Sequence, residues 1–193
     1  MNKFRVLITG CSSGLGLCLA NKFEQEGHFV FRHEGRKHFD LTSSDEIKKL
    51  SQEAKRQQID VLINNAAIVC PNIFLEKYDA DLIDSMIEVN LKAPIILTKN
   101  LLSNLKRVIN INSMVGLEVK TPRTLYSATK WGLRGFSNSF KKESSVKVLD
   151  VYPTNIKTAP DRINAMDIGW VVDKIYNAFI EQREELILDG RKM

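Results

Sequence analysis

The amino-acid sequence predicts an α/β protein with a doubly wound, mainly parallel sheet of six to seven strands and helices on both faces. Three observations lead to this fold class. The chain has 193 residues, 44% of them hydrophobic, which suffices for one core and a single domain over residues 1–193. Short β-rich runs alternate with helical stretches along the whole chain. A glycine-rich turn joins the first strand to the first helix.

The first elements follow from local patterning. Phe4–Ile8 is predicted as a strand, Leu15–Glu26 as a helix and Phe29–Arg32 as a second strand. Ser43 and Glu46 have the spacing of a capping box, and apolar residues follow at helical spacing, so another helix is expected there.

The segment His38–Leu41 departs from the alternating pattern. It follows the second strand after only a few residues. Two parallel neighbours need a crossover of about a dozen residues or more. We therefore expect that the helix usual at this point is deleted, and that a third strand here is reduced, irregular or antiparallel.

The remaining elements continue the alternation. Asp81 to Leu105 is predicted as helical, with an interruption or bend near Asn90–Pro94 because proline removes a helical hydrogen bond. The other predicted strands are Val61–Ile63, Val108–Ile111, Val146–Val151 and Leu186–Leu188, and the other helices are Tyr126–Lys141 and Ile168–Gln182.

Composition excludes several classes of function. The net charge of +5 comes from short basic clusters without interleaved aromatics, so we expect no nucleic-acid partner. No apolar run approaches the roughly 18 residues that span a membrane, and the start lacks a secretory signal, which predicts a cytoplasmic protein. Cys11, Cys18 and Cys70 have no spacing typical of a metal site or disulfide framework, so no metal is expected.

The turn after the first strand has the chemistry of a phosphate-binding loop. Gly10 allows a sharp turn, Gly14 a close approach of a pyrophosphate, and Gly16 close packing of the new helix on the sheet. The N–H groups of Ser12, Ser13 and Leu15 belong to this turn and helix start, where a positive dipole end favours anions. A tight structural turn would use the same glycines. The position between first strand and first helix favours dinucleotide binding.

A second group of residues points to proton transfer. Tyr126 and Lys130 are four apart on a predicted helix and share one face. An ammonium group nearby can lower the pKa of a tyrosine hydroxyl, although the same spacing also occurs on an ordinary amphipathic helix. Ser113 follows a strand at the carboxyl edge of the sheet, where a hydroxyl can bind a substrate carbonyl. Asn90 lies at the predicted bend, where freed backbone groups can bind water.

Together these residues resemble the short-chain dehydrogenase/reductases, a Rossmann-type family, over nearly the whole chain. The glycine turn resembles the family's cofactor motif, and Asn64-Asn65-Ala66-Ala67 resembles its N-N-A-G motif with Ala67 in place of glycine. Asn90, Ser113, Tyr126 and Lys130 match its catalytic tetrad in order and approximate spacing.

The resemblance implies a role for each matching residue. Tyr126 would exchange a proton with the substrate oxygen, Ser113 would position that oxygen, and Lys130 would bind the nicotinamide ribose and lower the pKa of Tyr126. Asn90 would hold a water in a relay with Lys130. The further cofactor contacts implied are Asp40, Leu41, Asn65, Ala66, Ala67, Pro153, Ile156 and Thr158.

Two departures from the family affect the substrate side. Pro153-Thr154 stands where Pro-Gly is usual. The family's insertion after the sixth strand is reduced to about Ala159–Asp167, so we expect an open pocket.

The cofactor is expected to be NADP(H) rather than NAD(H). A ribose 2′-phosphate needs positive charge, and Arg32, Arg36 and Lys37 follow the second strand within six residues. Arg32 is the first choice for the contact and Arg36 the second. Glu34 is the opposing feature, because an acidic residue at the ribose would favour NAD(H).

The sequence thus predicts an oxidoreductase that transfers a hydride between a nicotinamide cofactor and a small carbonyl or alcohol substrate. The alternative is a dinucleotide-sensing regulatory protein of the same fold with little turnover. The family resemblance also implies a homodimer or homotetramer paired through the helices at Leu91–Leu105 and Tyr126–Lys141.

Overall fold

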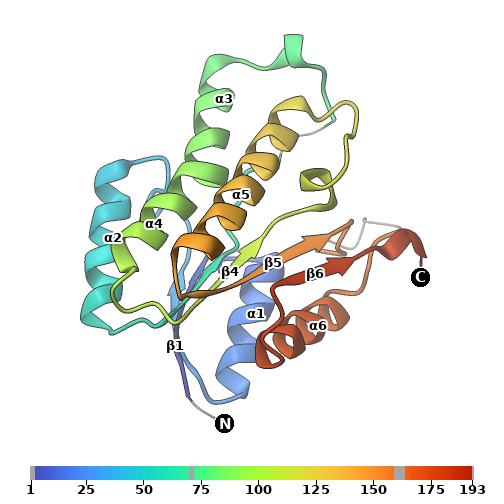
Figure 1. Ribbon diagram of the computed structural model, residues 1–193. Coiled ribbons are helices and arrows are strands. Elements are labelled where there is room, and N and C mark those ends of the chain that lie inside the picture. Colours follow the sequence, from blue (N-terminus) through green and yellow to red (C-terminus); the bar gives the residue numbers. More distant parts are fainter. Residues whose placement is uncertain (1–2, 70–71, 159–163, 193) are drawn as a thin grey trace.

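A parallel sheet forms the centre of the computed structural model, which describes residues 3–69, 72–158 and 164–192 (Figure 1). The described residues contribute six strands in the order β2-β1-β3-β4-β5-β6, and every neighbouring pair is parallel. The strands are β1 (Arg5–Thr9), β2 (Phe29–His33), β3 (Val61–Asn64), β4 (Arg107–Ile111), β5 (Lys147–Pro153) and β6 (Glu185–Leu188). The predicted Rossmann-type, doubly wound fold class is confirmed.

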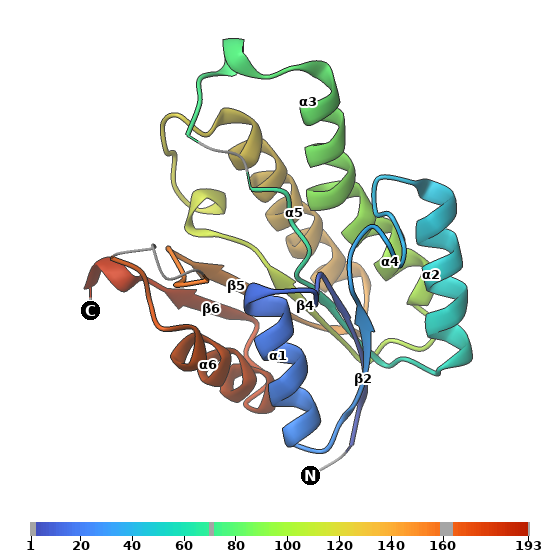
Figure 2. The ribbon, with the colours of Figure 1, turned by 180° about the vertical axis from the view of Figure 1, so that it is seen from behind.

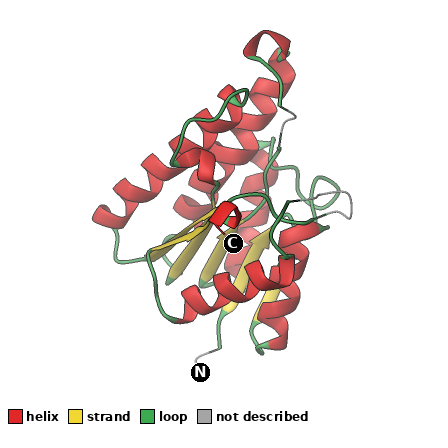
Figure 3. Cartoon of the chain, turned by 90° about the vertical axis from the view of Figure 1, so that its right-hand side faces the viewer, coloured by secondary structure: helices red, strands yellow, loops and turns green. Residues whose placement is uncertain are grey.

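Helices cover both faces of the sheet. On one face lie α1 (Gly14–Gln25) and α6 (Ile168–Ile180), side by side as Figures 1 and 2 show. The other face carries α2 (Ser44–Arg56), α4 (Ala93–Leu101) and α5 (Thr124–Glu143). Helix α3 (Ala80–Ile87) projects beyond the sheet beside α5 (Figure 3).

The two apolar cores follow from the alternation of side chains along each strand. In β1, Val6 and Ile8 pack into the core shared with α1 and α6, whereas Leu7 packs into the core shared with α2 and α4. All three are fully buried. A strand buried on both faces reads as a continuous apolar run, which explains why the strands could be found in the sequence.

The expected third strand at His38–Leu41 is absent, and this expectation was wrong. After β2 the chain turns at Gly35, whose φ is +89°, and His38 donates its N–H to the carbonyl of Gly35. The N–H of Thr42 then binds the Asp40 carboxylate at 2.9 Å, and Ser43 caps α2. These local hydrogen bonds lead directly into α2, so α2 is the crossover to β3 and β2 is left as the edge strand.

The predicted bend in the long helical stretch is a π-helical turn. Helix α3 ends at Ile87, the π turn covers Glu88–Lys92, and α4 begins at Ala93 with Pro94 in its first turn. Proline is tolerated there because the first N–H groups of a helix have no helical partner. The π turn brings Asn90 into the interior, where it is 1% exposed.

The thiols of the described chain are free. Cys11 is buried, and burial raises the pKa of its thiol to about 12, so it is unreactive at neutral pH. Cys18 is also free, and Cys70 lies outside the described residues. No helix in the described parts combines the length and apolar character that crossing a membrane requires.

Candidate active site and dinucleotide-binding pocket

The glycine turn after β1 has the geometry that close backbone packing demands. Gly10 and Gly14 have φ of +74° and +57°, in the left-handed region that favours glycine. A Cβ atom on Gly16 would lie 2.1 Å from the carbonyl oxygen of Gly10. Ser13 is the N-cap of α1 but its side chain makes no capping hydrogen bond, and the first turn carries no acidic residue. The N–H groups at this helix start therefore remain open to an anion.

Asn65 and Thr9 hold this turn against the end of β3. The side-chain amide of Asn65 donates to the carbonyls of Thr9 and Gly10 at 2.8 and 3.1 Å. In return, the hydroxyl of Thr9 accepts hydrogen bonds from the N–H groups of Asn65 and Ala66 at 3.0 Å each. The loop after β3 thus fixes the shape of the glycine turn.

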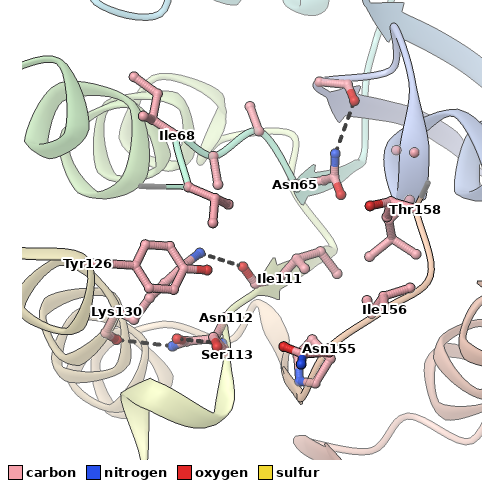
Figure 4. Close-up of a pocket in the computed structure, with 18 of the residues that line it drawn as sticks. Asn65, Ile68, Ile111, Asn112, Ser113, Tyr126, Lys130, Asn155, Ile156 and Thr158 are labelled. Carbon is pink, nitrogen blue, oxygen red and sulfur yellow. Dashed lines mark hydrogen bonds between the residues drawn. The ribbon is translucent and has the colours of Figure 1, made fainter. Parts of the chain in front are cut away.

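A cavity of about 1010 Å³ opens at the carboxyl ends of the strands. In an open parallel sheet this is the edge at which ligands bind. Figure 4 shows its wall between the glycine turn, the loop after β3 and helix α5. All but two of the predicted site residues line it: Gly10, Ser12, Ser13, Gly14, Leu15, Gly16, Asp40, Leu41, Asn65, Ala66, Ala67, Ser113, Tyr126, Lys130, Pro153, Ile156 and Thr158.

Tyr126, Ser113 and Lys130 meet at one wall of this cavity (Figure 4). The hydroxyl of Tyr126 lies near the side chain of Ser113, which acts to lower its pKa. Lys130 lies one helical turn further along α5, and its ammonium group donates to the carbonyl of Ile111 at 2.9 Å. Its Nζ atom lies 5.6 Å from the centroid of the Tyr126 ring.

Burial controls the ionisation of this group. Loss of solvent raises the pKa of the Tyr126 hydroxyl, while the side chain of Ser113 and the charge of Arg123 act in the opposite direction. Burial also lowers the pKa of Lys130 to about 8. The family resemblance implied that Lys130 would lower the pKa of Tyr126. In the structure the net shift is upward, because desolvation is the largest effect on the hydroxyl.

Asn90 is one of the two predicted residues that do not line the cavity. Its side-chain oxygen accepts from the N–H of Ile68 at 2.7 Å, and its amide donates to the carbonyl of Ile68 at 2.9 Å and to Thr129 at 3.4 Å. The carboxamide therefore clamps the loop after β3 to the π turn. A water held in a relay with Lys130 stays a prediction. Because the Asn90 side chain is already engaged, main-chain groups would have to help to bind that water.

Arg32 is the other predicted residue outside the cavity lining. Its guanidinium binds both carboxylate oxygens of Glu24, at 2.9 and 2.6 Å, and the side chain of Asn21 at 2.7 Å. Arg36 lines the cavity beside Asp40, with 3.7 Å between their nearest charged atoms. Glu34, the residue that favours NAD(H), does not line it. Of the two arginines considered for a 2′-phosphate, Arg36 lines the cavity and Arg32 does not.

A family model described as "short chain dehydrogenase" matches residues 35–166, which is more than half of the chain. The chain belongs to the short-chain dehydrogenase family.

Sequence relatives and solved structures agree with this assignment. Nodulation protein G of Rhizobium sp. (strain N33) is 34% identical over 171 residues, which cover 76% of this short-chain dehydrogenase and 69% of the relative. The bulky-bulky ketone specific alcohol dehydrogenase from Comamonas testosteroni has a TM-score of 0.85 at 23% identity, covering 97% of this chain and 86% of that one. An alcohol dehydrogenase from the archaeon Thermococcus sibiricus, complexed with 5-hydroxy-NADP, has a TM-score of 0.84 at 21% identity, covering 100% and 98%. At these identities, the two solved structures support the fold.

The connection between β5 and α6 spans residues 154–167. Residues 159–163, part of the predicted remnant of the family's insertion, lie outside the described residues. Arg191 of the final helical turn (Gly190–Lys192) lines the cavity and binds Glu118 at 2.7 Å. Among the described residues, no group of three or more His, Cys, Asp or Glu side chains could hold a metal.

Sequence reasoning missed two residues that shape the site. His33, the last residue of β2, accepts from the N–H of Gly10 through Nδ1 at 3.2 Å and lies 2.7 Å from the Phe39 carbonyl through Nε2. Asn112 connects β4 to α5: its oxygen accepts from the N–H of Ser113 and its amide donates to the Lys130 carbonyl. The signal for both was their place at the carboxyl ends of predicted strands.

Proposed function

We propose that this protein is an NADP(H)-dependent carbonyl reductase or alcohol dehydrogenase in which Tyr126 is the general acid and base. Its family membership and fold support NAD(P)-dependent oxidoreductase activity. Two structural relatives, a ketone-specific alcohol dehydrogenase and an alcohol dehydrogenase complexed with 5-hydroxy-NADP, support the finer assignment of substrate and cofactor.

One observation carries the proposal. Tyr126 and Ser113 line the same cavity as the uncapped N-terminus of α1 and the ammonium-bearing Lys130. A phosphate-binding turn alone would suit any nucleotide-binding protein. The buried tyrosine and the half-buried serine would add a proton donor and a hydrogen-bond donor for a developing alkoxide in the same space.

The residues present fit a dinucleotide. Ser13–Gly16 line the cavity, and their N–H groups would bind the pyrophosphate. Gly14 leaves room because the nearest atom to its missing Cβ is Thr158 Cγ2 at 3.5 Å. Asp40 and Leu41 would lie at the adenine, and Pro153, Ile156 and Thr158 at the nicotinamide. Once bound, the nicotinamide would supply or accept the hydride.

The chain's own groups would handle the proton. Because the pKa of Tyr126 is raised, its hydroxyl is protonated at neutral pH and can donate to the carbonyl oxygen during reduction. Ser113 would hold that oxygen through a hydrogen bond. One N–H of the Lys130 ammonium is engaged by the Ile111 carbonyl, which leaves two for ribose hydroxyls.

The assembly belongs to the same proposal. The outer surface of α5 exposes Trp131, which is 43% accessible, a large apolar side chain suited to an interface. We propose a homodimer or homotetramer paired through α4 and α5, related by a two-fold axis.

The test is a panel of ketones and aldehydes with NADPH and NADH, followed at the nicotinamide absorbance. We expect turnover with NADPH for the wild type, and a loss of about 100-fold or more in Tyr126→Phe with NADPH affinity retained. Tyr176→Phe is the matched control, because its hydroxyl binds His28 at 3.1 Å away from the cavity lining, and it should retain turnover. Tight cofactor binding without turnover on any substrate would instead favour the sensing alternative.

A further inference from the structure

Two cations lie on the wall of the cavity between β4 and α5. Lys120 and Arg123 follow the short helical turn Met114–Gly116, and both line the cavity together with Tyr126. Neither belongs to the residues that the proposed mechanism uses. A cation at this wall needs a role, or an acidic partner that neutralises it.

Arg123 is oriented by one hydrogen bond and otherwise free. Its Nε donates to the side chain of Asn72 at 2.6 Å, and within the described ranges its two terminal amino groups have no hydrogen-bond or ion-pair partner. The residue is half-buried and stands three positions before Tyr126, at the start of α5. Its charge reaches the Tyr126 hydroxyl, where it lowers the pKa. The guanidinium is therefore close to the reacting end of the cavity.

The acidic residues on the cavity lining are engaged elsewhere. Glu118 is held by Arg191 through two contacts of 2.7 and 3.3 Å. Asp167 caps α6 by accepting from the N–H of Trp170 at 2.8 Å. Lys120 is exposed and makes no hydrogen bond or ion pair in the part of the chain that the structure describes. Positive charge thus remains available at Arg123 and Lys120.

These cations follow a different strand from the residues proposed for the phosphates. The glycine turn follows β1 and Arg36 follows β2, whereas Lys120 and Arg123 follow β4. In the strand order, β4 lies two strand spacings from β1 and three from β2, which corresponds to about 10 and 14 Å. Because they line the cavity together with Tyr126, they are placed to contact the substrate.

We propose that the substrate carries an anionic group, a carboxylate or phosphate, in addition to its carbonyl or hydroxyl, and that Arg123 binds this group with Lys120 beside it. The inference rests on the proposed function and narrows its substrate class. The free end of a guanidinium offers two parallel N–H donors, which match the two oxygens of a carboxylate or phosphate. Binding there would place the anion at the wall and the carbonyl at Tyr126 and Ser113.

The experiment compares matched anionic and neutral substrates. The oxo acids 2-oxobutanoate, 3-oxobutanoate and 4-oxopentanoate are each assayed against their methyl esters, and dihydroxyacetone phosphate against dihydroxyacetone, with NADPH. For the wild type we expect at least one anion to exceed its neutral counterpart by about 10-fold or more in kcat/KM. The comparison of the oxo acids with dihydroxyacetone phosphate identifies whether the site binds a carboxylate or a phosphate.

Variants of Arg123 test whether this residue causes the preference for anionic substrates. In Arg123→Gln the anion-to-neutral ratio should fall by about 10-fold or more through a higher KM, and Arg123→Lys should restore part of it. Lys48→Gln removes the same charge from an exposed position on α2 and should keep the wild-type ratio. Equal use of acids and esters by the wild type, or an unchanged ratio in Arg123→Gln, would overturn the inference.

A binding measurement separates this inference from the proposed function. If no compound is turned over, the reductase proposal fails, and calorimetric titration of the same acids and esters into wild type and Arg123→Gln decides about the anion site. Binding of an acid but not its ester, lost in Arg123→Gln, supports the site. Absence of that difference contradicts it.

Discussion

Lys130 is a lysine whose charge is almost completely shielded from water, with 2% of the residue exposed. Burial lowers its pKa to about 8, compared with about 10.4 in an unfolded chain. Between these two values the unfolded chain binds more protons than the folded one, so the free energy of unfolding rises with pH. Below pH 8 the buried charge carries its full cost, and the cost is relieved as the pH rises to about 10.4.

This linkage predicts a pH-dependent difference between wild type and Lys130→Met. From pH 7 to pH 10 the free energy of unfolding of the wild type should rise relative to the variant, by up to about 3 kcal/mol. Urea unfolding at each pH measures the difference. Lys48→Met, on the exposed face of α2, is the control and should follow the wild type. Parallel curves for wild type and Lys130→Met would show that the ammonium is solvated.

We propose that a single arginine, Arg36, at the adenosine end decides the choice of cofactor. We expect Arg36→Ala to weaken NADPH binding by about 10-fold or more and to leave NADH binding unchanged, because only the 2′-phosphate needs the charge. Arg32→Ala removes the same charge four residues away, where the guanidinium is bound to Glu24, and should change neither affinity. Calorimetry with both cofactors measures these effects. Equal losses for NADH and NADPH in Arg36→Ala would contradict this assignment.

At the scale of elements, the first helix depends on the glycine turn that precedes it. Gly16→Ala would place a Cβ 2.1 Å from the Gly10 carbonyl and 2.4 Å from the Asn65 amide. The backbone must shift, so we expect a loss of about 1–3 kcal/mol in stability together with weaker NADPH binding. In Gly135→Ala the added Cβ meets nothing within 4 Å on α5, and the better helix former should raise stability by up to about 1 kcal/mol. Thermal unfolding and calorimetry on both variants provide the check.

The elements were predictable where burial on two faces produced continuous apolar runs. The central strands were found in this way, and the helices between them were found from helical apolar spacing and a capping box. The segment His38–Leu41 was misread because its fate depends on local hydrogen bonds, such as that from Thr42 to the Asp40 carboxylate, which spacing alone does not reveal. The bend at Asn90 was found from Pro94, but its π-helical form requires the packing of α5 against it.

The site was predictable in its residue types and less so in its contacts. The match of glycine turn, Ser113, Tyr126 and Lys130 located the cavity. The orientation of Arg32 toward Glu24 depends on α1 packing beside β2, a contact that the local sequence pattern does not reveal. The same holds for Asn90, whose partner Ile68 lies 22 residues earlier in the chain.

At the scale of the whole molecule, the proposed pairing of subunits predicts the mass in solution. Light scattering at micromolar concentration should give at least twice the monomer mass of 22.0 kDa. Trp131→Glu should reduce the mass toward that of the monomer, because a charge at an apolar interface is costly to bury. Phe74→Glu, at another exposed apolar residue, should leave the assembly intact. A monomeric wild type would contradict the pairing.

The packing of α1 against α6 has a consequence for the chain while it is being synthesised. Phe23 of α1 is completely buried against Tyr176 and Phe179 of α6. About 150 residues separate Phe23 from these partners. At usual translation rates, α6 is therefore synthesised roughly 8 to 30 seconds after Phe23. During that interval the emerging chain exposes an apolar surface on the α1 face of the sheet. A chaperone that binds nascent chains could bind this exposed apolar surface during that interval.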